Sequence, residues 1–381
     1  MRPPRLALYL DDGLVCGGAE RVAAQLLAHW ARRGWEVYLV ARKPLQDGFH
    51  ALPPGVVGLS LAPATDGAPS FGLARRRVLL PAAVRSLLRL VHEARRLRQV
   101  LRRIDADVAV AFLTPANVKL LLAVRGLRVR SVISERSDTR RYAYPRMWLV
   151  LRRWLYRLAD VVSANTQASI QDMERYVPKS RLVFLPNPFE PPPQDALARP
   201  AQSRRIVCVG RLAAEKRQGL LIQAFATLSP AFAEWELDIV GEGPLRAELE
   251  QAIARHGLGR RVHLHGLSKE VAAHYRAGAI FVLPSSVEGM PNALLEAMGH
   301  GLPCIVSDSI AVAHDYIEDG VAGLLFVADS AADLARRIES LAAPERRAAM
   351  GAAARQKLLA TAPDEAYHAW DRAILPDAKN Q

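Results

Sequence analysis

The segment 281–303 brings two carboxylates to the start of a predicted helix. An apolar run ends at Pro284, a loop carrying Glu288 follows, and the helix opens near Pro291. Glu296 lies one turn inside that helix. The unpaired N–H groups at a helix start favour a bound anion, and carboxylates beside an anion are suited to holding sugar hydroxyls. The pattern therefore predicts a site for a ligand with both phosphate and sugar.

Two cations precede another predicted helix and are candidates for the same ligand. A strand ends at Val209, and Arg211 and Lys216 lie in the loop and first helical turn that follow. Two positive charges at the carboxyl end of a strand can neutralise a departing nucleoside diphosphate. A solvated lysine in the first turn of a helix is the alternative for Lys216 taken alone.

Alternating strands and helices predict how these loops are positioned. Seven strand-like runs precede a proline-rich stretch and six follow it, so the 381 residues form two doubly wound α/β domains with largely parallel sheets. The first domain is 1–190, the linker 191–203, the second domain 204–362, and a final helix and tail 363–381. In such sheets ligands bind at the carboxyl ends of the strands. The predicted strands are 5–10, 36–40, 56–61, 108–112, 131–134, 161–164 and 182–185, then 205–209, 237–240, 262–264, 280–283, 304–306 and 324–327.

The Glu288-x7-Glu296 pair within Ser-x-x-Glu-Gly-x-Pro resembles the donor signature of retaining glycosyltransferases of family 4. The resemblance is dense after residue 200 and implies the two-domain GT-B fold, with the final helix packing back on the first domain. It implies that Arg211 and Lys216 stabilise the departing diphosphate. Glu288 would position the donor sugar, and Glu296 would hold the ribose. The other donor-binding positions that it implies are Gly17, Gly18, Gly210, Gly241, Gly266, Gly289, Met290, Pro291 and Asn292.

The first domain is the acceptor side in this family, and its loops supply candidate acceptor-binding residues. Many relatives carry a histidine after the strand equivalent to 108–112, but the loop here reads Phe-Leu-Thr-Pro-Ala-Asn. Transfer by front-face attack needs no such base, so no catalytic histidine is assigned. The candidates are Thr114, Asn117, Glu135 and Arg136, expected to face the cleft, with Arg140 and Arg141 suited to a pyrophosphate. For Thr114 and Asn117, the alternative is that they are ordinary polar residues of a loop. For Glu135 and the arginines, the alternative is an ion pair exposed to solvent in a loop.

Positive charge is concentrated in the first half of the chain. Residues 1–190 hold 31 Lys and Arg against 15 Asp and Glu, whereas residues 191–381 hold 20 against 23. The stretch 71–103 combines arginines with apolar residues at helical spacing, which is typical of helices that bind anionic membrane surfaces. An ordinary packed helix with an arginine-rich outer face is the alternative. The favoured acceptor is a polyprenyl-pyrophosphate-linked saccharide at a membrane face.

Composition and motifs argue against several other classes. Half of the residues are hydrophobic and 23% are charged, which excludes disorder, and no apolar run is long enough to span a membrane. No signal peptide is expected, which predicts a cytoplasmic protein. Asp105-Ala-Asp107 precedes a strand, so it predicts a turn, and no metal-binding cluster is expected elsewhere. Cys16, Cys208 and Cys304 are expected as reduced core thiols.

The resemblance to family 4 implies a retaining glycosyltransferase, and the lack of a metal-binding pattern predicts that it needs no cofactor or metal. It would move a hexose or N-acetylhexosamine from a nucleotide sugar to a saccharide, and uridine is the expected base because that is the family's commonest bacterial use. The product would be a cell-surface polysaccharide. A nucleotide-sugar epimerase of the same fold is one alternative. A non-enzymatic basic adaptor for a membrane or nucleic acid is another, although no nucleic-acid-binding module is visible.

Overall fold

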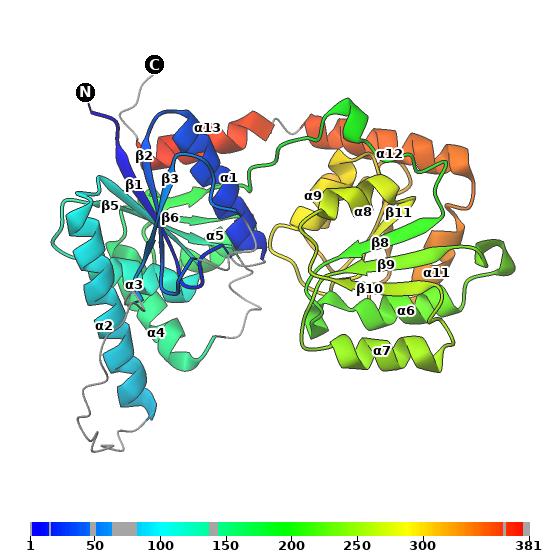
Figure 1. Ribbon diagram of the computed structural model, residues 1–381, viewed down its shortest axis with the longest axis horizontal. Helices are drawn as coiled ribbons and strands as arrows, with labels where there is room; N and C mark the ends of the chain where they lie inside the picture. The colour runs from blue at the N-terminus through cyan, green and yellow to red at the C-terminus, as the bar shows by residue number, and fades with distance from the viewer. Residues whose placement is uncertain are drawn as a thin grey trace. The chain divides into compact units, whose positions relative to one another are not determined.

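The computed structural model describes residues 2–14, 17–45, 51–62, 82–136, 144–360 and 363–375. Two compact units divide the chain: Met1–Pro186 with Tyr367–Gln381 forms the first, and Asn187–Ala366 forms the second. Each contains a parallel sheet flanked by helices, as the strand–helix alternation predicts (Figure 1). The first unit ends at Pro186 rather than at residue 190, and the chain rejoins it at Tyr367 rather than at residue 363.

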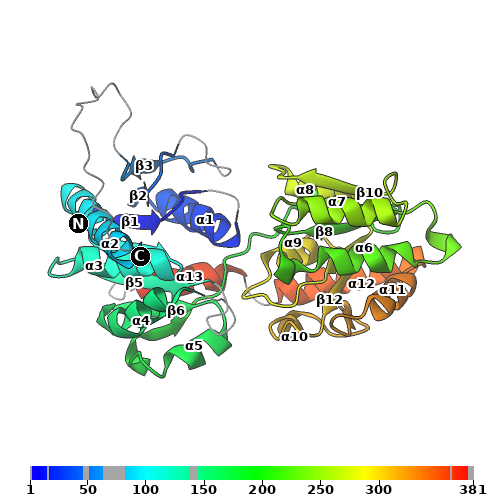
Figure 2. The same cartoon turned by 90° about the horizontal axis from the view of Figure 1, so that it is seen from below.

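Seven parallel strands form the first sheet within the described residues, in the order β3-β2-β1-β4-β5-β6-β7. Figure 2 shows the labelled strands of each unit in the order of its sheet. The strands are β1 (Arg5–Leu10), β2 (Glu36–Ala41), β3 (Val56–Ser60), β4 (Val108–Phe112), β5 (Arg130–Glu135), β6 (Val161–Ala164) and β7 (Leu182–Phe184). The helices are α1 (Gly18–Arg32), α2 (Ala82–Arg103), α3 (Thr114–Val124), α4 (Arg146–Leu155), α5 (Gln167–Met173) and α13 (Pro363–Ile374).

Trp370 anchors α13 in the core of the first unit. Its side chain is fully buried, with its ring centroid 5.6 Å from that of Phe112 on β4 and 6.4 Å from that of Trp30 on α1. Its indole N–H donates to the backbone oxygen of Pro186 at 3.1 Å. Burying a tryptophan removes about 150–250 Å² from water, which contributes about 4–6 kcal/mol. The final helix is therefore part of the first unit's core, as the resemblance implies.

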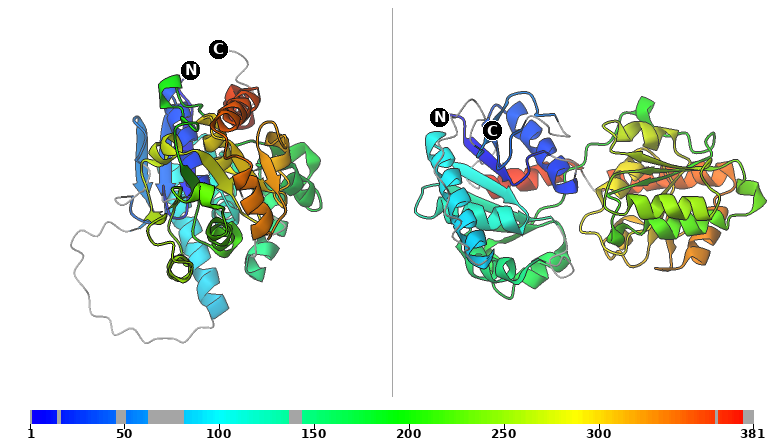
Figure 3. Two further views of the ribbon diagram at one scale, coloured as in Figure 1. Left: turned by 90° about the vertical axis from the view of Figure 1, so that its right-hand side faces the viewer. Right: turned by 60° about the horizontal axis from the view of Figure 1, so that its bottom comes forward.

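The helix α2 carries the basic, amphipathic character predicted for the stretch 71–103. It is described from Ala82 onward, so residues 71–81 lie outside the described residues. Leu97 and Leu101 are buried one turn apart, whereas Leu87 and Leu88 near the helix start are about half exposed. The start of α2 projects beyond the sheet (Figures 1 and 3). No helix in the described part of the chain has the length and apolar character needed to cross a membrane.

Six parallel strands form the second sheet as described, in the order β10-β9-β8-β11-β12-β13. They are β8 (Arg205–Val209), β9 (Glu236–Val240), β10 (Val262–Gly266), β11 (Ile280–Leu283), β12 (Cys304–Ser307) and β13 (Leu324–Phe326). The helices are α6 (Gln218–Ala226), α7 (Arg246–Arg255), α8 (Val271–Ala277), α9 (Asn292–Gly299), α10 (Ala313–Tyr316), α11 (Ala331–Glu339) and α12 (Pro344–Leu359).

The second sheet is covered on both faces. The helices α6 and α7 lie on one face with α11, and α8, α9 and α12 lie on the other (Figure 1). Burial on both faces explains the continuous apolar runs of β11 and β12. Because all six strands run parallel, the loops after β8, β9, β10 and β11 meet at one edge of the sheet.

Candidate active site

Two glycine loops interlock at the carboxyl ends of β8 and β9. The N–H of Gly210 donates to the Val240 oxygen at 3.0 Å, and the N–H of Gly241 donates to the Gly266 oxygen at 2.9 Å. Gly241 has φ +150°, and a Cβ there would lie 2.0 Å from the Gly210 oxygen, so only glycine fits. The structure thus brings the predicted positions Gly210, Gly241 and Gly266 together at the ligand-binding edge.

An ion pair joins the loop after β8 to the loop after β11. The Lys216 ammonium donates to Oε1 of Glu288 at 2.5 Å, and the Ser285 hydroxyl donates to the same oxygen at 2.7 Å. The Lys216 side chain is 22% exposed and that of Glu288 is 11% exposed. The two loops are also joined by the N–H of Ser286, which donates to the Glu215 oxygen at 2.8 Å. The predicted phosphate-binding cation and sugar-binding carboxylate therefore lie in direct contact.

Arg211 supplies a second cation at the same edge. Its backbone oxygen accepts a hydrogen bond from the Gln218 side chain at 2.9 Å, which fixes the turn before α6. The residue is exposed, and within the described ranges its guanidinium has no hydrogen-bonding or ion-pair partner. An exposed, unpaired guanidinium is available for a bidentate contact with phosphate.

Glu296 is held deeper in α9. It is 6% exposed, and the Tyr275 hydroxyl of α8 donates to its Oε2 at 3.0 Å. The backbone oxygen of Glu296 accepts from the N–H of His300 at 3.0 Å, which continues the helix to its end. The carboxylate thus has a fixed orientation one turn behind the loop that carries Glu288 and Gly289.

The loop that leads into α9 is held by side chains from two other segments. Met290 is buried, and its sulfur accepts a hydrogen bond from Tyr316 at 3.5 Å. The Asn187 side-chain amide donates to the side-chain oxygen of Asn292, the first residue of α9. Pro291 stands at the N-cap, which agrees with the predicted helix start. These contacts hold the two ends of the segment 290–292 against Tyr316 and Asn187.

The glycine pair of the first unit lies at the carboxyl end of β1. Gly17 is the N-cap of α1 and Gly18 is its first residue. A Cβ on Gly17 would lie 2.2 Å from a carboxylate oxygen of Glu20, whose pKa is raised by burial. The pair therefore stands at the ligand-binding edge of its own sheet, where the sequence predicts it.

Thr114 and Asn117 lie in a helix and not in the loop that the sequence analysis expected. Both residues belong to α3 and are fully buried. The Thr114 hydroxyl donates to Oε1 of Glu135 at 2.6 Å, and the Asn117 amide donates to the Tyr156 hydroxyl at 2.9 Å. The first turn of α3 accepts Pro115 because the missing N–H of a proline needs no partner there.

Glu135 and Arg136 are also buried, at 1% and 8% exposed, so neither forms the expected cleft-facing loop. Burial raises the pKa of the Glu135 carboxyl. The Arg136 guanidinium donates to the Leu185 oxygen at 3.0 Å and lies over the rings of Phe112 and Trp370. Desolvation lowers its pKa to about 9. The candidate acceptor residues therefore have partners inside the first unit, and Arg140 and Arg141 lie outside the described residues.

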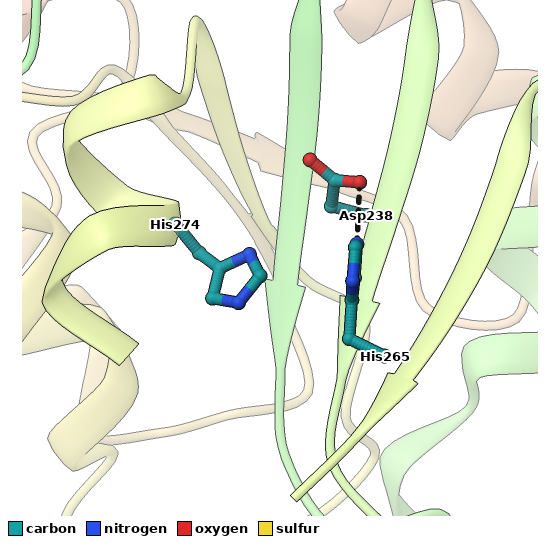
Figure 4. Close-up of side chains that lie close together, drawn as sticks. All are labelled: Asp238, His265 and His274. Carbon is teal, nitrogen blue, oxygen red and sulfur yellow. Dashed lines mark hydrogen bonds and ion pairs between the residues drawn. The ribbon is translucent and has the colours of Figure 1, made fainter. Parts of the chain in front are cut away.

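A cluster that the sequence did not predict lies on β9, β10 and α8. Asp238, His265 and His274 bring one ligand atom each to within 4.8 Å of one another (Figure 4). The sequence analysis did not anticipate this grouping of possible metal ligands. Burial favours a higher pKa for Asp238, but hydrogen bonds from His265 and Arg205 outweigh it and lower the pKa. The sequence did carry a signal for this cluster in the alternations Glu236-x-Asp238 and His263-x-His265. Alternate residues of a strand share a face, so each pair places two possible metal ligands on one side of the sheet.

Asp105 and Asp107 form the predicted helix-to-strand turn. Asp105 has φ +50°, and both carboxylates accept hydrogen bonds from the Arg2 guanidinium at 2.9 Å. Cys208 and Cys304 are buried free thiols, as expected, and burial raises the pKa of Cys208 to about 12. Cys16 lies outside the described residues.

Two family matches together cover most of the chain. Residues 16–192 match Glycosyltransferase Family 4, and residues 193–357 match the family described as Glycosyl transferases group 1. The boundary between the two matches lies in the predicted proline-rich linker.

Named relatives and solved structures agree with these matches. The chain is 30% identical over 247 residues to the GalNAc-α-(1→4)-GalNAc-α-(1→3)-diNAcBac-PP-undecaprenol α-1,4-N-acetyl-D-galactosaminyltransferase of Campylobacter jejuni, covering 64% of this chain and 67% of that one. It is 31% identical over 125 residues to the amylovoran biosynthesis glycosyltransferase AmsD of Erwinia amylovora, covering 33% and 34%. Sucrose-phosphate synthase from Thermosynechococcus elongatus has the same fold, with TM-score 0.77, 20% identity and 98% coverage of both chains. HepE of Anabaena, solved with UDP and glucose, gives TM-score 0.75 at 20% identity, covering 96% of this chain and 99% of that one.

Proposed function

Since the chain belongs to glycosyltransferase family 4 and has the GT-B fold, we propose that it is a retaining enzyme with a UDP-linked donor and a lipid-linked acceptor. It is a glycosyltransferase that acts in polysaccharide or lipid-linked glycan synthesis. The transferred group is a hexose or an N-acetylhexosamine, and no metal ion takes part in the transfer. The enzyme works at the cytoplasmic face of a membrane.

The contact between Lys216 and Glu288 carries the proposal. Glu288 orients the donor sugar, while Lys216 and the unpaired guanidinium of Arg211 bind the diphosphate. As the bond between the anomeric carbon and the phosphate oxygen breaks, negative charge grows on the diphosphate beside these two cations. The acceptor hydroxyl attacks the same face of the sugar and passes its proton to the departing phosphate oxygen. Glu296, fixed by Tyr275, holds the ribose.

The names of relatives support the choice of donor and acceptor. HepE was solved with UDP and with UDP-glucose. The Campylobacter jejuni relative is named for an undecaprenol-linked saccharide. A pyrophosphate on the lipid would be attracted to the basic first half of this chain, which has 31 Lys and Arg among residues 1–190.

The helix α4 supports attachment to an anionic membrane surface. Trp154, Val150 and Leu158 are 61%, 56% and 53% exposed on this helix and the turn that follows it. Arg153 and Arg157 are exposed beside them, and the Arg157 guanidinium lies 4.4 Å from the centre of a Trp154 ring. Apolar side chains that insert among lipid headgroups, with arginines near the lipid phosphates, are the features of interfacial helices.

Donor use is tested by measuring UDP release and product formation with a series of UDP-sugars and a polyprenyl-pyrophosphate-linked saccharide. We expect UDP release to need both substrates and the product to retain the anomeric configuration. Glu288→Gln should remove turnover but lower the unfolding temperature only modestly, because the glutamine side-chain oxygen can still accept from Lys216 and Ser285. An epimerised nucleotide sugar formed without acceptor would contradict the proposal, as would full activity of Glu288→Gln.

Membrane attachment is tested by co-sedimentation with vesicles that contain phosphatidylglycerol. We expect binding at low salt that weakens at high salt, since each arginine near anionic lipid contributes about 1 kcal/mol. Changing Trp154 and Val150 to serine should reduce binding. The matched control is Val327→Ser, which removes an apolar side chain of similar exposure (57%) from the second unit. Equal binding by the wild type, the variant with serine at Trp154 and Val150, and Val327→Ser would contradict the proposal that α4 binds the membrane.

A further inference from the structure

One face of β9 and β10 is polar, although the opposite face belongs to the core. Leu237 and Ile239 of β9 pack into the apolar cluster with α6, α7 and α11. The residues between and beside them point to the other face, so Asp238 lies there. His263 and His265 alternate in the same way on β10, with His263 in register with Asp238. The short helix α8 contributes His274 to this face (Figure 4).

The three side chains of the cluster lie close to one another. The Nε2 atom of His265 lies 2.7 Å from Oδ1 of Asp238, and the rings of His265 and His274 have centroids 4.7 Å apart. All three ligand atoms lie within 4.8 Å of one another. Ligand atoms around a tetrahedral metal with bonds of about 2.05 Å are about 3.4 Å apart, so side-chain rotations suffice to reach that geometry. We propose that Asp238, His265 and His274 form a binding site for a divalent transition metal in the second unit.

The surroundings of the cluster favour a cation. Oδ2 of Asp238 accepts from the Arg205 guanidinium at 2.9 Å, which orients the carboxylate and leaves Oδ1 directed at the histidines. The same guanidinium pairs with Glu236 at 2.7 Å. With neutral imidazoles, the two carboxylates and one guanidinium leave a net charge of −1, so a dication is attracted. A hydrogen-bonded outer shell of this kind is typical of metal-ligating carboxylates.

The ligand set selects the class of metal. Two imidazole nitrogens and one carboxylate oxygen suit Zn²⁺ and its neighbours, whereas Mg²⁺ and Ca²⁺ prefer oxygen ligands alone. Asp238 is buried, but the His265 side chain is 33% exposed, so solvent reaches the site and supplies the fourth ligand. The metal would tie β9 and β10 to α8. It stands apart from the Lys216–Glu288 pair, because β8 separates β9 from β11 in the sheet.

Zinc binding to the full chain tests the site without reference to activity. The protein is prepared without an affinity tag, stripped with a chelator and titrated with Zn²⁺ against a competing dye. We expect one equivalent to bind and to raise the unfolding temperature. Co²⁺ in place of Zn²⁺ should give the visible absorption of a four-coordinate site.

Two single-histidine variants separate this cluster from other surface histidines. His274→Ala should weaken Zn²⁺ binding at least about tenfold, since even outer-shell changes cost metal sites 10–100-fold in affinity. His263→Ala is the matched control. His263 lies on the same strand as His265, but its side chain pairs with Glu236 outside the cluster. Unfolding temperatures of the metal-free proteins show that both variants are folded. Failure of the wild type to bind one equivalent, or equal weakening in both variants, overturns the proposal.

Discussion

Replacing Lys216 by methionine tests whether the cation beside Glu288 stabilises the departing diphosphate. Methionine keeps the apolar stem of lysine and removes only the charge, so packing changes little. The ammonium lies 2.5 Å from Glu288, and its side chain is 22% exposed. The guanidinium of Arg211 is unaffected, so the variant removes one of the two cations assigned to the diphosphate.

The expected loss of activity is much larger than the loss of stability. Removing one donor to a developing negative charge costs about 2.7–4 kcal/mol, which lowers kcat by about 10²–10³-fold. A hydrogen bond to a charged group contributes about 1.5–3 kcal/mol to folding. Here the loss should lie at the lower end of that range, because the Ser285 hydroxyl still donates to Glu288 at 2.7 Å in the variant. Each 1 kcal/mol lowers the unfolding temperature of a unit this size by about 2–4 °C.

The assay measures the rate of UDP release at saturating donor and acceptor, with the unfolding temperature in parallel. The control is Arg217→Met, because Arg217 is the next residue, carries the same charge and pairs at the surface with Asp329 at 2.9 Å. Only Lys216→Met should lose turnover. Wild-type kcat in Lys216→Met, or an equal fall in both variants, would refute the reasoning.

Contacts elsewhere in the two units lead to three more expected outcomes. Gly241→Ala should severely lower the unfolding temperature, because its Cβ would lie 2.0 Å from the Gly210 oxygen. The control Gly257→Ala has φ +66° and open space around the new Cβ, so it should lower the free energy of unfolding by only about 1–2 kcal/mol. Similar unfolding temperatures for the two variants would contradict this. Trp370→Ala should lower the free energy of unfolding of the first unit by about 3–5 kcal/mol in urea, and unchanged unfolding would show that α13 does not support that core. Burial raises the native pKa of Glu135, so its protonated form stabilises the fold at low pH, and this contribution is lost as pH rises through that pKa. Relative to wild type, Glu135→Gln should therefore gain stability as the pH rises above the ordinary pKa of a glutamate and through the raised native pKa. A stability difference that does not change with pH would count against a raised pKa.

Strands with strong local signals were predictable from the sequence. Short apolar runs bounded by turn residues identified β1, β4, β6, β8 and β11 at their observed residues. For Lys216 and Glu288, the sequence could predict only that both lie at the same edge of the sheet, because parallel strands bring their carboxyl ends to one edge. It could not predict that the two side chains form an ion pair. The contact itself depends on β8 and β11 being adjacent, which nothing in the chain order shows.

Two features could not be predicted, for different physical reasons. The helix α3 is buried almost all round, so it lacks the polar stripe that reveals an amphipathic helix. The cluster of Asp238, His265 and His274 depends on which strands are neighbours and on which helix covers them. Alternation along β10 shows that its histidines share a face, but not that an aspartate lies beside them.

Because Trp370 is buried in the first unit, the core of that unit cannot be completed until the end of the chain has been made. Residues are made in chain order, so the whole second unit is translated between Pro186 and the segment that fills the first unit's core. At about 5–20 residues per second, that interval lasts roughly 10–40 s. Throughout it, the apolar surface around Trp30 and Phe112 lacks its cover and is open to chaperones, proteases and other nascent chains. A stop codon just before residue 367 would spare every strand of both sheets and still leave the first-made domain without the centre of its core.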